Sequence, residues 1–308
     1  MKERAKHINY GRYTYFDDEL ELSKKISDLH KELDGVEPQY VFCGSGSTSL
    51  LYGIAAYLNR KGTKKVYFIP PMYFTLHIAF DGFGIQTIPI SDKHPFERDF
   101  KLELPIEEGS VLILIDPIWY AGAPISPDII NEISLWQKKT KSTVIVDGSL
   151  QYMAWDHSTM EPTAQLDPYL TFRLICPSKQ LSSHGYRFSY VLLPILEKQS
   201  FAWTYTNMFG SANADSVAFG HEAIEEIRKR TIPNKIMDLA SYRHSLLRSK
   251  SAIESVYNPS CGYFIFEKIN VKLPQDYIKV DGKYFDQDNF PGYTKINLLS
   301  PSINILGI

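Results

Sequence analysis

The stretch "RLICPSKQLSSHGYRFSYVLLP" (173–194) contains two apolar runs, with a lysine and an arginine between them. Lys179 follows the apolar residues 174–176 and precedes small polar residues at positions 182, 183 and 185. A solvated surface lysine rarely has such neighbours. The pattern predicts a buried strand that ends just before Lys179, a turn that carries Arg187, and a second strand over 188–194.

The rest of the chain alternates similar short apolar runs with helical patterns. Strands are expected at 40–43, 65–70, 111–116, 142–147 and 170–176, and helices at about 17–34, 48–60, 73–82 and 127–139. This alternation predicts an α/β fold with a mainly parallel central sheet and helices on both faces. After residue 200 come two helical stretches, at about 212–232 and 234–255, and then strands. We therefore expect an N-terminal arm and helix (1–35), a large domain (36–198) and a small α+β C-terminal domain (199–308).

The composition is that of a globular protein, and it narrows the class of ligand. Of 308 residues, 44% are hydrophobic and 22% are charged, and the formal net charge is −2. This charge argues against a nucleic-acid partner. Cys43, Cys176 and Cys261 show no Cys-x-x-Cys spacing, so neither a metal site nor a disulfide framework is expected. Because no apolar leader and no long apolar segment occurs, we expect a cytoplasmic protein without a membrane span.

The residues after each strand are the candidates for ligand binding, because open parallel sheets bind ligands beyond the carboxyl ends of their strands. The first strand is followed by Gly46, Ser47 and Thr48, which lead into a helix. Free backbone N–H groups and hydroxyls at such a helix start favour a phosphate, although an ordinary helix cap is the alternative. The dinucleotide-binding, P-loop and nucleophile-elbow patterns do not match this stretch.

Four further side chains near the strand ends are of types that can bind a cofactor or take part in a reaction. Asp147 ends an apolar strand, where it either caps a turn or pairs with a cationic or protonated group. Lys179 is either a surface amine or a nucleophile that forms an imine with an aldehyde. Arg187 is either half of a structural ion pair or a clamp on a phosphate. With Tyr73 as an aromatic face for a ring, these groups together meet the needs of pyridoxal 5′-phosphate (PLP).

Seven stretches, in the right order, resemble motifs of the class I/II aminotransferase family, the fold-type-I PLP-dependent enzymes, over roughly residues 40–300. They are "GSTSL" (46–50), "PPMYF" (70–74), "DPIWYAGAPIS" (116–126), "VIVDGSLQY" (144–152), "CPSKQLSSHGYRFSY" (176–190), "NPSCGYFIFEKI" (258–269) and "GYTKINLL" (292–299). In the third stretch Pro117, Gly122 and Ser126 keep the family's pattern. Any one of these motifs is weak, but the ordered set points to the fold and the cofactor.

The resemblance implies a role for each matching residue. Lys179 would form the internal aldimine with PLP, Asp147 would keep the pyridine nitrogen protonated, and Tyr73 would stack on the ring. A family member would be a homodimer with its active site at the subunit interface. The phosphate would be bound by Gly46, Ser47, Thr48, Cys176, Ser178, Arg187 and an N-terminal tyrosine of the partner subunit, Tyr15 or alternatively Tyr13.

Three positions depart from the family pattern where the reaction and the substrate are decided. Trp119 replaces the asparagine that hydrogen-bonds the phenolic oxygen of the cofactor, and Leu150 replaces a tyrosine that would join it. Lys295 replaces the arginine that binds the substrate's α-carboxylate, so charge is kept but the two-pronged match is lost. The segment between Lys268 and Gly282 is short, which predicts that one helix of the small domain is missing. The substrate is expected to contact Tyr10, Trp119, Tyr120 and Lys295.

The sequence therefore indicates a divergent and short PLP-dependent enzyme that acts on an amino acid or a related primary amine. An aminotransferase, with Lys179 as internal aldimine and proton shuttle, is the leading hypothesis. One alternative keeps the cofactor and changes the reaction to elimination, decarboxylation or cyclisation. The other is a non-catalytic protein that keeps only the fold.

Overall fold

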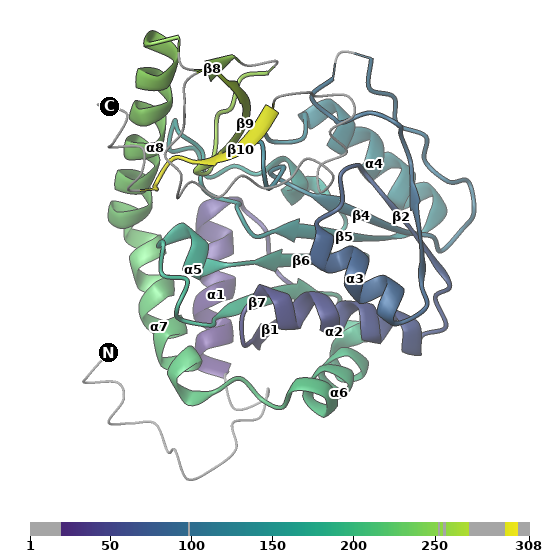
Figure 1. The fold of residues 1–308 in the computed structure, drawn as a ribbon. Helices are drawn as coiled ribbons and strands as arrows, with labels where there is room; N and C mark the ends of the chain where they lie inside the picture. Colours follow the sequence, from purple (N-terminus) through teal and green to yellow (C-terminus); the bar gives the residue numbers. More distant parts are fainter. Residues whose placement is uncertain (1–19, 98, 252, 255–256, 271–292, 301–308) are drawn as a thin grey trace.

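The computed structural model describes residues 20–97, 99–251, 253–254, 257–270 and 293–300. Its main sheet consists of β1 (Tyr40–Gly44), β2 (Lys65–Phe68), β3 (Gln86–Pro89), β4 (Val111–Ile115), β5 (Thr143–Gly148), β6 (Thr171–Ile175) and β7 (Ser189–Leu193). These strands have the order β1-β7-β6-β5-β4-β2-β3 (Figure 1). All neighbouring pairs from β6 to β3 are parallel, whereas β7 is antiparallel to both β1 and β6. The expected mainly parallel α/β sheet is confirmed.

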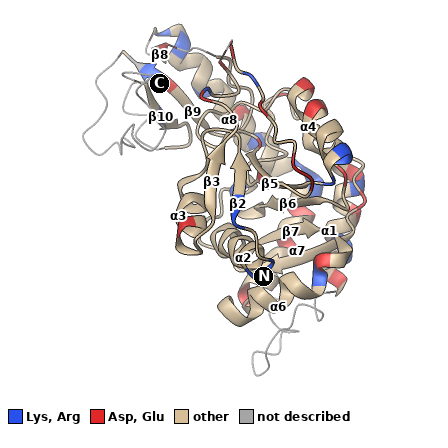
Figure 2. Cartoon of the chain, turned by 90° about the vertical axis from the view of Figure 1, so that its right-hand side faces the viewer, with Lys and Arg blue, Asp and Glu red and all other residues tan. Residues whose placement is uncertain are grey.

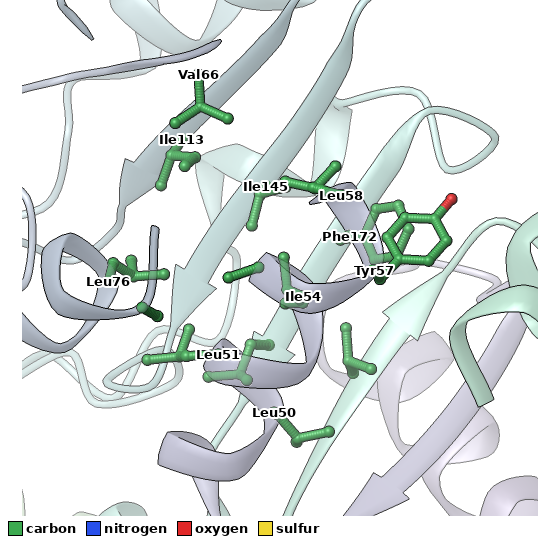
Figure 3. Packing of buried hydrophobic residues seen from close by; sticks show 14 of the residues in the cluster. Leu50, Leu51, Ile54, Tyr57, Leu58, Val66, Leu76, Ile113, Ile145 and Phe172 are labelled. Atoms are coloured by element: carbon green, nitrogen blue, oxygen red, sulfur yellow. The ribbon is translucent and has the colours of Figure 1, made fainter. Parts of the chain in front are cut away.

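Helices cover both faces of this sheet. One face carries α2 (Ser47–Arg60), α3 (Phe74–Gly82) and α6 (Lys198–Phe209), and the other carries α1 (Leu20–Leu33), α4 (Pro127–Thr140) and α7 (Ala214–Lys229). Side chains alternate between the faces along each strand. In β4, Ile113 packs in the cluster with α2, while Leu112 and Leu114 pack in the cluster with α4. Figure 3 shows Leu51 and Ile54 of α2 among the apolar side chains of the strands.

A second sheet lies above the carboxyl ends of the parallel strands (Figure 1). It is antiparallel, with the order β10-β9-β8, and contains β8 (Ile253–Glu254), β9 (Phe264–Ile269) and β10 (Tyr293–Asn297). Helix α8 (Thr231–Ser249) packs against it in an apolar cluster that also contains Leu150, from the loop after β5. The bounds of α8 differ from those of the helix predicted over 234–255.

The contact between the two sheets depends on a close backbone approach at Gly122. The Gly122 carbonyl accepts hydrogen bonds from the amides of Ser260 (2.8 Å) and Cys261 (3.1 Å). A Cβ atom at Gly122 would lie 2.5 Å from the Phe264 carbonyl oxygen, and its φ of 61° also favours glycine. This contact brings the first residue of β9 next to the loop after β4.

Several short elements were not predicted. The edge strand β3 has half-exposed and exposed residues and no apolar run, and α6 carries aromatic residues that gave no clear helical stripe. The chain also forms a four-residue helix α5 (Pro177–Gln180) and 3₁₀ turns at Pro162–Gln165 and Ile195–Glu197. The predicted N-terminal arm lies outside the described residues, as does most of the segment between Lys268 and Gly282.

The surface carries charges of both signs. On the face shown in Figure 2, basic and acidic residues are interspersed over the helices and loops around α4 and α1. The three cysteines, all in the described part of the chain, form no disulfide bond. Within the described ranges, no helix combines the length and apolar character that a membrane span requires, and no three metal-ligating side chains cluster.

Candidate active site

A cavity of about 150 Å³ lies at the carboxyl ends of the parallel strands, under the second sheet. The main sheet supplies side chains at or after the carboxyl ends of β2, β4, β5 and β6, the start of α2 supplies one residue, and the second sheet supplies one residue each from β9 and β10. The lining residues are Ser47, Tyr73, Phe74, Ile115, Pro117, Trp119, Asp147, Ser149, Leu150, Lys179, Phe264 and Lys295. The cavity thus lies at the carboxyl edge of the parallel strands, where the sequence predicted a ligand.

Lys179 enters the cavity from the short helix α5, directly after β6. Its backbone N–H donates to the carbonyl of Cys176 (3.0 Å), which turns the chain sharply at the strand end. Cys176 and Ser178 in the same turn are buried, with 3.2 Å between the sulfur and the hydroxyl oxygen. Neither of these two residues lines the cavity, and the side chain of Lys179 is only half-buried.

Asp147 reaches the same cavity from the end of β5 and is 4% exposed. Burial raises the pKa of its carboxyl, while the hydrogen bond from Ser149 and the charge of Lys179 oppose that shift. The hydroxyl (2.5 Å) and the amide (3.1 Å) of Ser149 both donate to the same oxygen, Oδ1. These contacts leave Oδ2 for another donor, such as a protonated ring nitrogen.

The turn before α2 combines an open helix start with a guanidinium group. Gly46 caps α2 with a φ of 89°, and within the described part of the chain no side chain caps this end. The amides of the first helical turn have no carbonyl partner one turn earlier, so they attract an anion. The exposed Arg187 lies against this turn: a Cβ atom at Gly46 would be only 2.6 Å from the Nη2 atom of Arg187. Ser47 lines the cavity, and Thr48 is exposed beside it.

Aromatic side chains form the wall of the cavity that faces the second sheet. The rings of Tyr73 and Trp119 are 4.9 Å apart and nearly perpendicular. The Nζ atom of Lys295 lies 4.4 Å from the centre of the Trp119 ring and 3.8 Å from that of Phe264. Burial, together with the charge of Lys179, lowers the pKa of Lys295 to about 7. Leu150, 2% exposed, completes the wall with an apolar surface.

The structure corrects one predicted contact with the substrate. Tyr120 is fully buried in the cluster beneath α4, and its hydroxyl lies 2.5 Å from Nδ1 of His94. The neighbouring Trp119 takes the place at the cavity, because consecutive side chains of this loop point in different directions. Tyr10, Tyr13 and Tyr15 lie outside the described residues.

Five residues of the cavity were not predicted to line it. Phe74, Pro117 and Phe264 belong to stretches that resemble family motifs, and Ser149 follows Asp147 by two positions, so the sequence did hold a signal for these four. Ile115, the last residue of β4, gave no signal beyond its place at a strand end.

A buried ionic network lies between β6 and the end of α1. Arg173, 3% exposed, contacts Oδ2 of Asp34 (2.7 Å) and donates to Gln151 (2.6 Å) and to the hydroxyl of Tyr152 (2.7 Å). Burial raises the pKa of Asp34, but the hydrogen bond with His30 and the charge of Arg173 outweigh burial and bring it far below the usual range. The network connects the strand before Lys179 to the helix on the far face of the sheet.

Comparison with known proteins shows the class of fold. No protein-family model and no curated protein matches the chain. Solved structures nevertheless match it over nearly its whole length, and they show that it has the fold of the class I aminotransferases, the fold-type-I architecture.

Three of these structures illustrate the similarity. A probable N-succinyldiaminopimelate aminotransferase from Thermus thermophilus is 16% identical, with a TM-score of 0.80, and the match covers 99% of this chain and 87% of that chain. Substrate-bound BacF from Bacillus subtilis is 14% identical, with a TM-score of 0.78 and coverage of 98% and 83%. YbdL from Escherichia coli, described as having a methionine aminotransferase function, is 14% identical, with a TM-score of 0.76 and coverage of 98% and 84%.

Proposed function

We propose that this protein is a PLP-dependent enzyme, most specifically an aminotransferase, that acts on an amino acid or a related primary amine. The observation that carries the proposal is that Lys179 and Asp147 line one cavity. A nucleophilic amine and a buried carboxylate are the two groups that the aldehyde and the ring nitrogen of PLP require. The fold supports the proposal independently.

The remaining residues of the site fit PLP as well. Its phosphate would be held by the free amides and hydroxyls of Ser47 and Thr48 and by Arg187, which Gly46 admits close to the helix start. Tyr73 would contact the ring. The contacts predicted for Cys176 and Ser178 stay predictions, because both side chains are buried and neither lines the cavity.

PLP, when bound, supplies an aldehyde carbon and an electron-accepting ring. The Nζ atom of Lys179 would bind that aldehyde and, once released by the substrate, take the proton from the substrate's α-carbon. Asp147 would hold a proton on the ring nitrogen. Lys295 would orient an anionic group of the substrate, and Trp119, Leu150 and Phe264 would exclude water and favour an apolar side chain.

The direct test is covalent trapping at Lys179. The protein is incubated with PLP, reduced with borohydride, digested and analysed by mass spectrometry. We expect one reduced cofactor on the peptide that contains Lys179, and none on it in Lys179→Arg, which keeps the charge but lacks the primary amine. Lys235→Arg, at an exposed position of α8, is the control and should label as wild type does. Labelling that is spread over surface lysines, or that persists in Lys179→Arg, would disprove the cofactor assignment.

A PLP-dependent lyase, decarboxylase or cyclase is the second candidate. The observation that favours it is that Trp119 and Leu150 line the cavity where donors to the phenolic oxygen were expected. Amino donors distinguish the two candidates, because only transamination converts the cofactor to its pyridoxamine form. A chain that binds no PLP at all would instead be a non-catalytic member of the fold.

We also propose a cytoplasmic homodimer, in which Tyr15 or Tyr13 of the partner subunit contacts the phosphate and Tyr10 contacts the substrate. These tyrosines lie outside the described residues, so the proposal depends on the resemblance of the sequence. Sedimentation equilibrium of the purified protein measures the subunit number, and a monomer at micromolar concentration would contradict it.

A further inference from the structure

Tyr205 of α6 lies outside the cavity but bonds to the turn that starts α2. Its side chain is 1% exposed. The backbone amide of Ser45 donates to its hydroxyl oxygen at 3.0 Å, and the hydroxyl of Ser49 lies 2.9 Å from the same atom. The Ser49 hydroxyl in turn donates to the carbonyl of Gly46 at 2.9 Å. One tyrosine thus connects residues on both sides of the N-cap.

The directions of these hydrogen bonds follow from the number of protons. Ser49 has one hydroxyl proton and gives it to Gly46, so Tyr205 must be the donor to Ser49. The order is therefore Ser45 amide to Tyr205, Tyr205 to Ser49, and Ser49 to the Gly46 carbonyl. Burial raises the pKa of Tyr205, although its bonds to Ser49 and Ser45 oppose that shift, so the hydroxyl keeps its proton at neutral pH.

Two glycines provide the space that Tyr205 occupies. A Cβ atom at Gly53 would lie 2.8 Å from Cδ2 of Tyr205, and one at Gly44 would lie 2.7 Å from Cδ2 of Leu50 and 2.9 Å from the Tyr205 hydroxyl. Neither glycine has a positive φ, so the backbone conformation does not require them. The edge of the Phe42 ring packs against Tyr205 with the ring centres 5.0 Å apart. The ring is therefore packed closely on these sides and hydrogen-bonded at its hydroxyl.

We propose that Tyr205 is a positioning residue for the phosphate of PLP, an inference that rests on the proposed function. Its hydroxyl fixes the amide of Ser45 and, through Ser49, the carbonyl of Gly46. The amides of Ser47 and Thr48 then remain directed at the anion. Because Arg187 lies against Gly46, the same bonds set the position of the turn relative to the guanidinium. A preorganised turn binds the anion without a further cost of ordering.

The test compares PLP with pyridoxal, which lacks the phosphate, by equilibrium dialysis against the full chain. Tyr205→Phe keeps the ring and removes only the hydroxyl. We expect it to raise the Kd of PLP about three- to tenfold, the effect of one or two hydrogen bonds, and to leave the Kd of pyridoxal unchanged. Tyr57→Phe is the matched control, because Tyr57 is buried in the same cluster and its hydroxyl donates to Glu197, away from the turn.

Each outcome decides the inference. A loss of affinity for PLP alone, absent from Tyr57→Phe, supports it. Equal losses for PLP and pyridoxal, or no difference between the two tyrosine variants, overturn it while the proposed function stands. Failure of the wild type to bind PLP overturns the proposed function and this role with it. If Tyr205→Phe does not fold, Ser49→Ala breaks the same chain of bonds outside the core and should give the same phosphate-specific loss.

Discussion

Replacement of Lys295 by methionine should stabilise the protein at neutral pH. Its ammonium group faces two aromatic rings, and among the described residues no carboxylate lies within ion-pair distance of it. Burial lowers its pKa from 10.5 to about 7. Because the pKa of Lys295 is lower in the folded state than in the unfolded chain, the charged lysine lowers the free energy of unfolding. That cost is complete below pH 7 and disappears as the pH rises through 10.5.

The size of this destabilisation follows from the difference between the two pKa values of Lys295. At 1.36 kcal/mol for each pH unit, the cost at pH 7 is at most about 4 kcal/mol. Attraction to the aromatic faces offsets about 0.5–2 kcal/mol of it. We therefore expect Lys295→Met to raise the free energy of unfolding by about 2–3.5 kcal/mol at pH 7. At pH 9.5 the folded lysine is already neutral, so the aromatic offset is absent and the expected gain is about 1.4 kcal/mol.

Urea denaturation of the cofactor-free protein at pH 7 and pH 9.5 measures this difference. Lys268→Met is the matched control, since Lys268 is an exposed lysine on the neighbouring strand and should change stability by less than about 0.5 kcal/mol. If Lys295→Met is no more stable than this control at pH 7, or if its gain is the same at both pH values, the reasoning is wrong. A confirmed gain would mean that the lysine is kept at the expense of stability, as expected of a residue that binds substrate.

Three further substitutions test the packing around the site. Gly53→Ala should lower the free energy of unfolding by about 1–3 kcal/mol, because its Cβ would overlap Tyr205, and urea denaturation measures the loss. Asp34→Asn leaves the charge of Arg173 buried and should cost about 3–5 kcal/mol at pH 7. Since the folded pKa of Asp34 is depressed, the wild type loses this stability as the pH falls below about 4, so the two unfolding curves should converge in acid. Tyr120→Phe should leave KM for any substrate unchanged and cost about 1 kcal/mol of stability, because Tyr120 is buried away from the cavity.

Controls for these substitutions come from exposed positions of the same chain. Gly82→Ala lies at the end of α3 with no atom within 4 Å of the new Cβ, and it should be neutral or stabilising. Asp81→Asn changes an exposed carboxylate and should alter stability by less than about 0.5 kcal/mol. If Gly82→Ala destabilises the protein as much as Gly53→Ala, steric overlap is not the cause. If Asp81→Asn destabilises it as much as Asp34→Asn, burial of an unpaired charge is not the cause. A raised KM in Tyr120→Phe would contradict its placement in the core.

The strand ends illustrate what could be predicted and what could not. Asp147 and Lys179 follow apolar runs, and the carboxyl ends of parallel strands share one edge of a sheet, so their meeting in one cavity was predictable. Strand β3 was not, because at the sheet edge its side chains are half-exposed and form no apolar run. Helix α6 was missed because its aromatic residues pack against several neighbours and leave no single apolar stripe.

The sequence by itself determined the α/β class, the alternation of strands and helices, and the polar residues at the strand ends. All of these follow from local periodicity and from the fixed geometry of parallel sheets. Only the tertiary structure decided that Trp119 rather than Tyr120 lines the cavity, that Phe264 and Trp119 enclose Lys295, and that Tyr205 bonds to the turn before α2. Those contacts join segments that are distant in the sequence, from 31 residues for Phe264 and Lys295 to 176 for Trp119 and Lys295, or depend on the direction of a single side chain in a loop. No local pattern encodes either of these.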